Sequence, residues 1–219
     1  MDATTELLSS SYDVVLLLVA IYAAWRFRQL NLPGKLVCLL IWNGFLTERI
    51  AMLTSYYYGT NMPAYTVATY TEYFIICLFF NYTLSGFAKK NIGIYLGIVG
   101  VLLGIGNTIY IQPLSSINSN FIFLSCLILI CLTLYLTFRM LIAMDVVPSR
   151  EVHFWFSIIM LFFYCSTLWI WAIYDYVFVA GSEADKQLVA NWLMGVGHIV
   201  YPAYAILLYR YPKLKRSYV

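Results

Sequence analysis

Charged residues are scarce in this chain of 219 residues: 11% of them are charged, whereas 63% are hydrophobic and 18% are aromatic. A soluble globular protein is nearer half apolar and a quarter charged, so this composition excludes a water-soluble fold. A membrane span needs about 20 apolar residues, which leaves room for seven or eight spans and for no soluble catalytic domain.

Histidine is scarce too, and cysteine lacks any metal-binding or disulfide pattern. The chain has two histidines and five cysteines, and no two cysteines have CxxC spacing. Such sparse ligands predict neither a metal site nor a cofactor. All five cysteines lie in apolar runs, so we interpret them as small buried hydrophobic residues: Cys38, Cys77, Cys126, Cys131 and Cys165.

The N-terminus also lacks the positive charge of a cleavable signal peptide. Asp2 and Glu6 stand where such a peptide carries lysine or arginine, and Arg26 and Arg28 follow the first apolar run. We therefore expect the first run to be retained as a span.

Apolar windows bounded by turn residues and charges predict an all-α integral membrane bundle of seven transmembrane helices. Short loops join the helices, and the whole chain, 1–219, forms a single domain. The predicted spans are 10–27, 36–58, 64–86, 91–111, 119–143, 154–179 and 187–209.

The distribution of lysine and arginine predicts the orientation, because short cytoplasmic loops retain these residues. Eleven cations fall on one side of the predicted bundle: Arg26, Arg28, Lys35, Lys89, Lys90, Arg139, Arg150, Arg210, Lys213, Lys215 and Arg216. The other side has Lys186, next to acidic residues. We expect the N-terminus outside and the C-terminus in the cytoplasm, and the basic residues mark topology rather than nucleic-acid binding.

Ionisable residues within the spans are the main functional signal, because charge at membrane depth is costly and usually faces the bundle interior. These residues are Glu48, Arg49, Glu72, Asp175 and His198, and most of them fall at mid-depth or in the outer half. Each also has a structural explanation: Arg49 neutralising Glu48, a Glu72–His198 hydrogen bond between helices, or a solvated helix end at Asp175.

Helical spacing places further polar and aromatic side chains on the same faces as these groups. Together they predict an outward-facing polar and aromatic pocket in the outer half of the bundle. The predicted ligand-binding set is Glu48, Arg49, Tyr65, Thr69, Glu72, Tyr164, Trp171, Asp175, Asn191, His198 and Tyr201.

The helix count and orientation resemble those of the microbial rhodopsins, but the last span has no lysine to hold retinal. The zinc hydrolases of the alkaline ceramidase type need three histidines, and this chain has only His153 and His198. In size, helix number and intramembrane carboxylates, the chain resembles the small membrane-bound terpene cyclases. No motif of that family aligns, so no residue role follows from the resemblance.

Three functions fit these residues. The first is ligand binding or sensing in the outer pocket, with a small-molecule or lipid ligand and a pH response through His198. The second is an intramembrane enzyme acting on a lipid or isoprenoid, in which a protonated carboxylic acid donates a proton; the catalytic candidates are Glu48, Glu72, Asp175 and His198. The third is a small transporter or channel with an acid and histidine relay.

The expected partners are membrane lipids. Because the chain ends about ten residues after the last predicted span, signalling would require a protein partner on the basic cytoplasmic face, unless the chain is a piece of a longer protein.

Overall fold

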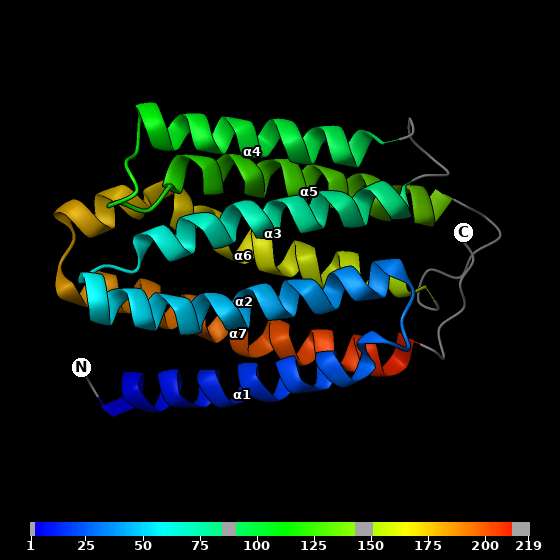
Figure 1. Ribbon diagram of the computed structural model, residues 1–219, viewed down its shortest axis with the longest axis horizontal. Helices are drawn as coiled ribbons and strands as arrows, with labels where there is room; N and C mark the ends of the chain where they lie inside the picture. Colours follow the sequence, from blue (N-terminus) through cyan, green and yellow to red (C-terminus); the bar gives the residue numbers. More distant parts are fainter. Residues whose placement is uncertain (1–2, 85–90, 143–150, 212–219) are drawn as a thin grey trace.

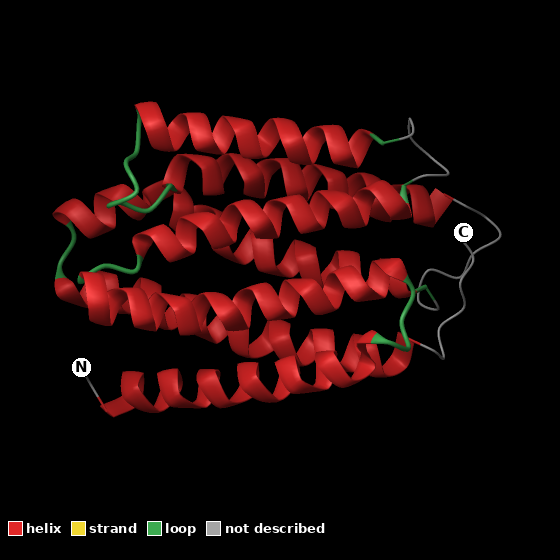
Figure 2. Cartoon of the chain, viewed as in Figure 1, coloured by secondary structure: helices red, strands yellow, loops and turns green. Residues whose placement is uncertain are grey.

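The computed structural model describes residues 3–84, 91–142 and 151–211 (Figure 1). Long helices run side by side along one axis and alternate in direction (Figure 2). The helices are α1 (Ala3–Phe27), α2 (Leu32–Tyr58), α3 (Met62–Thr83), α4 (Ile92–Tyr110), α5 (Ser119–Ile142), α6 (Val152–Ala180) and α7 (Glu183–Arg210). Each predicted span overlaps one of them, so the helix positions inferred from apolar runs are confirmed.

Local chemistry explains where α2 begins and ends. The side chain of Asn31 precedes the helix and accepts a hydrogen bond from the Gly34 amide at 3.2 Å, and Pro33 lies in the first turn. Gly59 ends the helix with a φ of 70°, a left-handed conformation that glycine adopts without steric cost. The connection to α3 is therefore short and tight.

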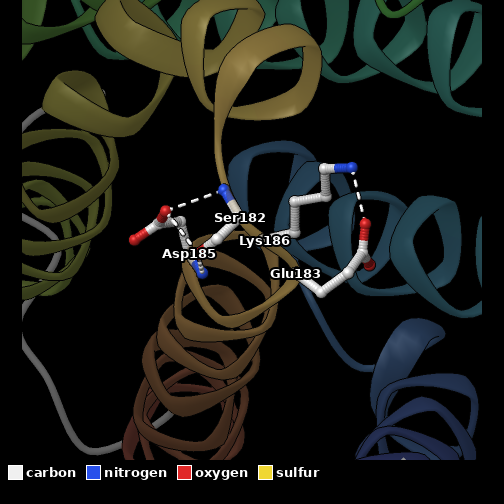
Figure 3. Close-up of polar contacts among 4 residues, drawn as sticks. All are labelled: Ser182, Glu183, Asp185 and Lys186. Atoms are coloured by element: carbon white, nitrogen blue, oxygen red, sulfur yellow. Dashed lines mark hydrogen bonds and ion pairs between the residues drawn. The ribbon is translucent and has the colours of Figure 1, made fainter.

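The α6–α7 connection is a capping box (Figure 3). The Asp185 amide donates to Ser182 Oγ at 3.2 Å, and the Ser182 amide donates to Asp185 Oδ2 at 2.9 Å. Beside this box, Lys186 Nζ lies 2.8 Å from Glu183 Oε1, so the positive charge of Lys186 is paired within the same turn.

Six helices of the described chain, all except α3, are long and apolar enough to cross a membrane. Their outward faces carry exposed large apolar side chains, among them Leu18, Leu102, Phe138 and Ile206. A bundle with an apolar exterior of this kind is typical of a multi-pass membrane protein. α3 combines a polar first half, which carries Glu72 and several tyrosine and threonine side chains, with an apolar second half from Phe74 to Phe80.

The helices form a ring with one additional helix on its outside. α1 packs between α2 and α7, α3 packs against α2 and α5, and α6 packs between α5 and α7. α4 packs mainly on the outer side of α3, where a stripe of glycines on α4 faces aromatic side chains of α3. Six helices, namely α1, α2, α3, α5, α6 and α7, therefore surround the bundle interior.

The interpretation of all five cysteines as buried is wrong for two of them. Cys38, Cys77 and Cys126 are buried, but Cys131 and Cys165 are exposed on the outer surface of the bundle. An apolar run does not distinguish the two sides of a membrane helix, because the lipid-facing side is as apolar as the core.

Candidate functional site

An open cavity of about 800 Å³ lies at the end of the bundle where α1 begins and α2 ends. Its polar lining includes Asp13 of α1, Glu48 and Arg49 of α2, and Tyr65 of α3. Trp171 of α6 contributes an aromatic wall. We refer to this cavity as the outer cavity.

Two polar contacts organise the lining of the outer cavity. Arg49 forms an ion pair with Asp13, and its guanidinium lies over the Phe45 ring, 5.7 Å from the ring centroid. Tyr65 Oη donates a hydrogen bond to Glu48 Oε2 at 3.0 Å. The ion-pair partner of Arg49 is therefore an acid on α1 rather than its chain neighbour Glu48.

Beneath the outer cavity lies a second one, which we call the inner chamber, with a volume of about 230 Å³. Tyr12, Glu48, Tyr65 and Trp171 line both spaces, so the two adjoin. α5, which contributes nothing to the outer cavity, closes one side of the inner chamber with small side chains such as Ser125.

Glu72 lies in the inner chamber and is held by one hydrogen bond across the bundle. Tyr164 Oη of α6 donates to Glu72 Oε1 at 2.9 Å. Thr69, one turn earlier on α3, also lines the chamber, and its hydroxyl donates to the Tyr65 carbonyl at 2.8 Å. The predicted polar face Tyr65, Thr69 and Glu72 thus faces the bundle interior.

The inner chamber ends in a small void of about 60 Å³, lined by Glu72, Tyr201 and Tyr204 among others. Aromatic side chains pack together toward the bundle end where α6 begins. Phe156 stacks on Tyr204 with ring centroids 5.8 Å apart, and the ring centroids of Phe156 and Phe79 are 4.0 Å apart. Both phenylalanines are buried. In the described part of the chain, the path therefore narrows to a close-packed floor.

The connection between α4 and α5 forms part of the cavity wall. Ile117 of this connection lines both the outer cavity and the inner chamber. The next residue, Asn118, is buried and donates to Tyr70 Oη at 2.6 Å and to Thr108 Oγ1 at 2.8 Å. A hydrogen-bond network thus fixes the segment that places Ile117.

Eight of the eleven predicted ligand-binding residues line the outer cavity, the inner chamber or both: Glu48, Arg49, Tyr65, Thr69, Glu72, Tyr164, Trp171 and Tyr201. Tyr201 and Glu72 also line the small void beneath the inner chamber. These eight residues come from α2, α3, α6 and α7.

Two of the remaining three, His198 and Asn191, do not join this group. His198 faces α1: its Nε2 lies 2.9 Å from Ser11 Oγ, and its Nδ1 donates to the Met194 carbonyl at 2.8 Å. Glu72 is therefore not the partner of His198. Asn191 is absent from the cavity linings described above, and its buried Oδ1 has no hydrogen-bond partner among the described residues. The side chain of Asp175 lies outside the described part of the structure.

Sequence reasoning missed several lining residues. Asp13 and Tyr12 come from α1, where Asp13 lies near the start of the predicted span 10–27 and resembles a boundary residue. Ser125 and Cys126 of α5 are small and uncharged, so nothing in their local pattern marks them. The presence of Asp13 within an apolar run is the one signal that could have identified α1 as a contributor.

The chemistry of the site is that of carboxylates surrounded by aromatic rings. Within the described residues, no group of three or more histidine, cysteine, aspartate or glutamate side chains is placed to hold a metal ion. Comparisons with protein-family models, curated proteins and solved structures find no match for this chain. The function must therefore be argued from the geometry.

Proposed function

We propose that this chain is a seven-span membrane protein that binds a small-molecule or lipid ligand, for sensing, in a pocket open to the outside. The single observation that carries this proposal is the pair of adjoining cavities between the helices, which together reach from the bundle end to Glu72. Concave sites with aromatic walls and a few convergent polar groups are typical of ligand pockets.

Seven spans and an N-out, C-in orientation account for the helix arrangement. α3 lies within the ring and runs between the same two ends as its neighbours (Figure 1), which supports a seventh span despite its polar face. The described cations Arg26, Arg28, Lys35, Arg139 and Arg210 lie near the bundle end opposite the outer cavity. The remaining predicted cytoplasmic cations lie outside the described residues.

The packed floor below Glu72 argues against the transporter or channel hypothesis. Conduction needs a path across the bundle, and Phe79 and Phe156 pack closely where that path would continue. Signal transfer would instead require a protein partner on the basic face, which we propose as the intracellular contact.

An intramembrane enzyme acting on a lipid or isoprenoid is the second candidate. The observation that favours it is Glu72 in an aromatic-walled chamber with Tyr164 Oη at 2.9 Å, since a carboxylic acid in such a setting can serve as a general acid. Formation of a new product from an isoprenoid by purified protein would distinguish this function from binding alone.

A thermal-shift screen of purified protein tests the binding proposal. Lipid extracts and small metabolites are compared at about pH 5.5 and about pH 7.5, a range in which a histidine can change its charge. We expect at least one extract to raise the melting temperature of the native protein but not that of Ala68→Leu, which fills the inner chamber.

Ala24→Leu provides the matched control, because Ala24 is exposed on the outside of α1. A shift that survives in both variants would place binding elsewhere on the protein. The absence of a shift from every extract would contradict the proposal.

A further inference from the structure

The inner chamber has an unusual balance of charge. Its lining includes two carboxylates, Glu48 and Glu72, and no lysine, arginine or histidine among the described residues. Seven aromatic side chains complete much of the wall: Tyr12, Tyr65, Tyr73, Phe163, Tyr164, Trp171 and Tyr201. A chamber with this lining disfavours anions and lacks an internal counter-ion for its acids.

Glu72 is the clearest case of an acid without a cation. Its hydrogen bond from Tyr164 involves Oε1, and the ion pairs among the described residues, Arg49–Asp13 and Lys186–Glu183, do not include it. A carboxylate away from bulk water is costly unless a positive group is brought to it. The hydrogen bond from Tyr164 leaves Oε2 of Glu72, a residue of the chamber lining, for a contact with a ligand.

The outer cavity favours the entry of a cation. Arg49 forms its ion pair with Asp13 of α1 and not with Glu48 on the same helix. Among the described residues, the lining of the approach from the bundle end therefore has two carboxylates, Asp13 and Glu48, and one cation, Arg49. A path lined by one sign of charge concentrates ions of the opposite sign.

Aromatic walls select the kind of cation. Calcium and magnesium take six or more oxygen ligands, which this chamber does not assemble around Glu72. Ring faces instead attract ammonium groups through their quadrupole, and they tolerate bulky alkyl substituents that cannot hydrogen-bond. Carboxylate and rings together match an alkylammonium ion.

We propose that the inner chamber binds an organic ammonium ion, with Glu72 as its counter-ion and the aromatic rings around its alkyl groups. This inference rests on the proposed function, since it names the ligand class of the same pocket. The ammonium group could belong to a free amine or to a lipid headgroup, and the test separates the two.

The experiment uses the full chain in nanodiscs of phosphatidylglycerol, with choline as the probe. Its uncharged carbon isostere, dimethylbutanol, has the same shape without the positive charge. We expect choline to raise the melting temperature in a saturable manner and to change tryptophan fluorescence, because Trp171 lines the chamber. We expect the isostere to bind at least about tenfold more weakly, given the strength of desolvated cation–π contacts.

Glu72→Gln tests the counter-ion and is expected to weaken choline binding at least about tenfold. Glu183→Gln is the matched control, because Glu183 is an exposed carboxylate at the same bundle end but outside the chamber. The comparison of choline with its isostere on the native protein does not depend on whether Glu72→Gln folds. Sodium chloride at equal ionic strength controls for salt.

The outcomes of these binding measurements separate the ammonium proposal from the proposed pocket function. Equal binding of choline and the isostere would overturn the ammonium proposal and leave the pocket function standing. The ammonium proposal would also be overturned if choline did not bind while a lipid extract still raised the melting temperature of the native protein but not that of Ala68→Leu. The pocket function would again stand. Loss of the choline response in nanodiscs that contain phosphatidylcholine would support a headgroup as the ligand, and a response unchanged there would support a free amine.

Discussion

Asn118 shows how single polar residues hold the cavity wall in place. Its side-chain amide donates to Tyr70 Oη at 2.6 Å, to Thr108 Oγ1 at 2.8 Å and to the Gly104 carbonyl at 3.3 Å. Its Oδ1 accepts from the Phe121 amide at 3.3 Å at the start of α5. One buried side chain thus connects α3, α4 and α5 next to Ile117.

We predict that Asn118→Ala lowers the free energy of unfolding by about 1–3 kcal/mol, because it leaves buried partners unsatisfied. Asn120→Ala is the control, since its exposed side chain makes one hydrogen bond of 3.5 Å, to Asn107. Reversible unfolding in mixed detergent micelles measures both. Equal destabilisation by the two substitutions would show that the network does not hold the wall.

At the scale of helices, α4 depends on close approach to α3. A Cβ atom added at Gly100 would lie 2.5 Å from Cζ of Tyr73, a ring that is 2% exposed. The hydroxyl of this tyrosine donates to the Leu96 carbonyl at 3.2 Å, so displacing the ring would also weaken a hydrogen bond between the helices. Glycine is required here by contact rather than by backbone conformation.

Gly100→Ala is therefore expected to destabilise the protein by about 1–3 kcal/mol through overpacking. Gly106→Ala on the same helix is the matched control, because a Cβ there meets nothing within 4 Å. Its effect is expected to lie between zero and about 1 kcal/mol of stabilisation from helix propensity. If both variants unfold at the same detergent concentration, the close contact between Gly100 and the Tyr73 ring does not limit the α3–α4 packing.

The sequence predicts the helices and the polar face of α3 well, because both depend on residues that are close together in the sequence. Asn31 and Pro33 mark the start of α2, and the spacing of Tyr65, Thr69 and Glu72 places them on one face of α3. The rotation of a helix within the bundle depends on its neighbours. For this reason sequence spacing does not predict that His198 faces Ser11 of α1 instead of the inner chamber.

Contributions from several helices are harder still to predict. Asp13, which pairs with Arg49, lies on α1, and Cys126, which lines the inner chamber, lies on α5. The ionisable residues predicted within the spans include none from these two helices. A lining of this kind depends on how helices that are distant in the sequence pack against one another. The polar first half of α3, by contrast, is visible in the sequence, and it contains the cavity-lining residues Tyr65, Thr69 and Glu72.

Within the described part of the whole molecule, the bundle is open at one end and packed with aromatic side chains toward the other. The outer cavity lies at the end where α1 begins, and the aromatic floor lies below Glu72. The orientation of the chain then decides which side of the membrane supplies the ligand. Both binding proposals depend on a pocket that opens to the outside.

Cysteine labelling in intact cells tests this claim most directly. Thr69→Cys places a thiol in the inner chamber, and Gln29→Cys places one in the exposed α1–α2 connection at the opposite end. Both are made with Cys131 and Cys165, the exposed native cysteines, changed to serine. The reagent is a membrane-impermeant trimethylammonium methanethiosulfonate added outside, and mass spectrometry reads the modification.

We predict that Thr69→Cys is modified in intact cells, whereas Gln29→Cys is modified only after the membrane is permeabilised. Modification of Thr69→Cys only after permeabilisation, or modification of Gln29→Cys from outside, would contradict the outward-facing pocket.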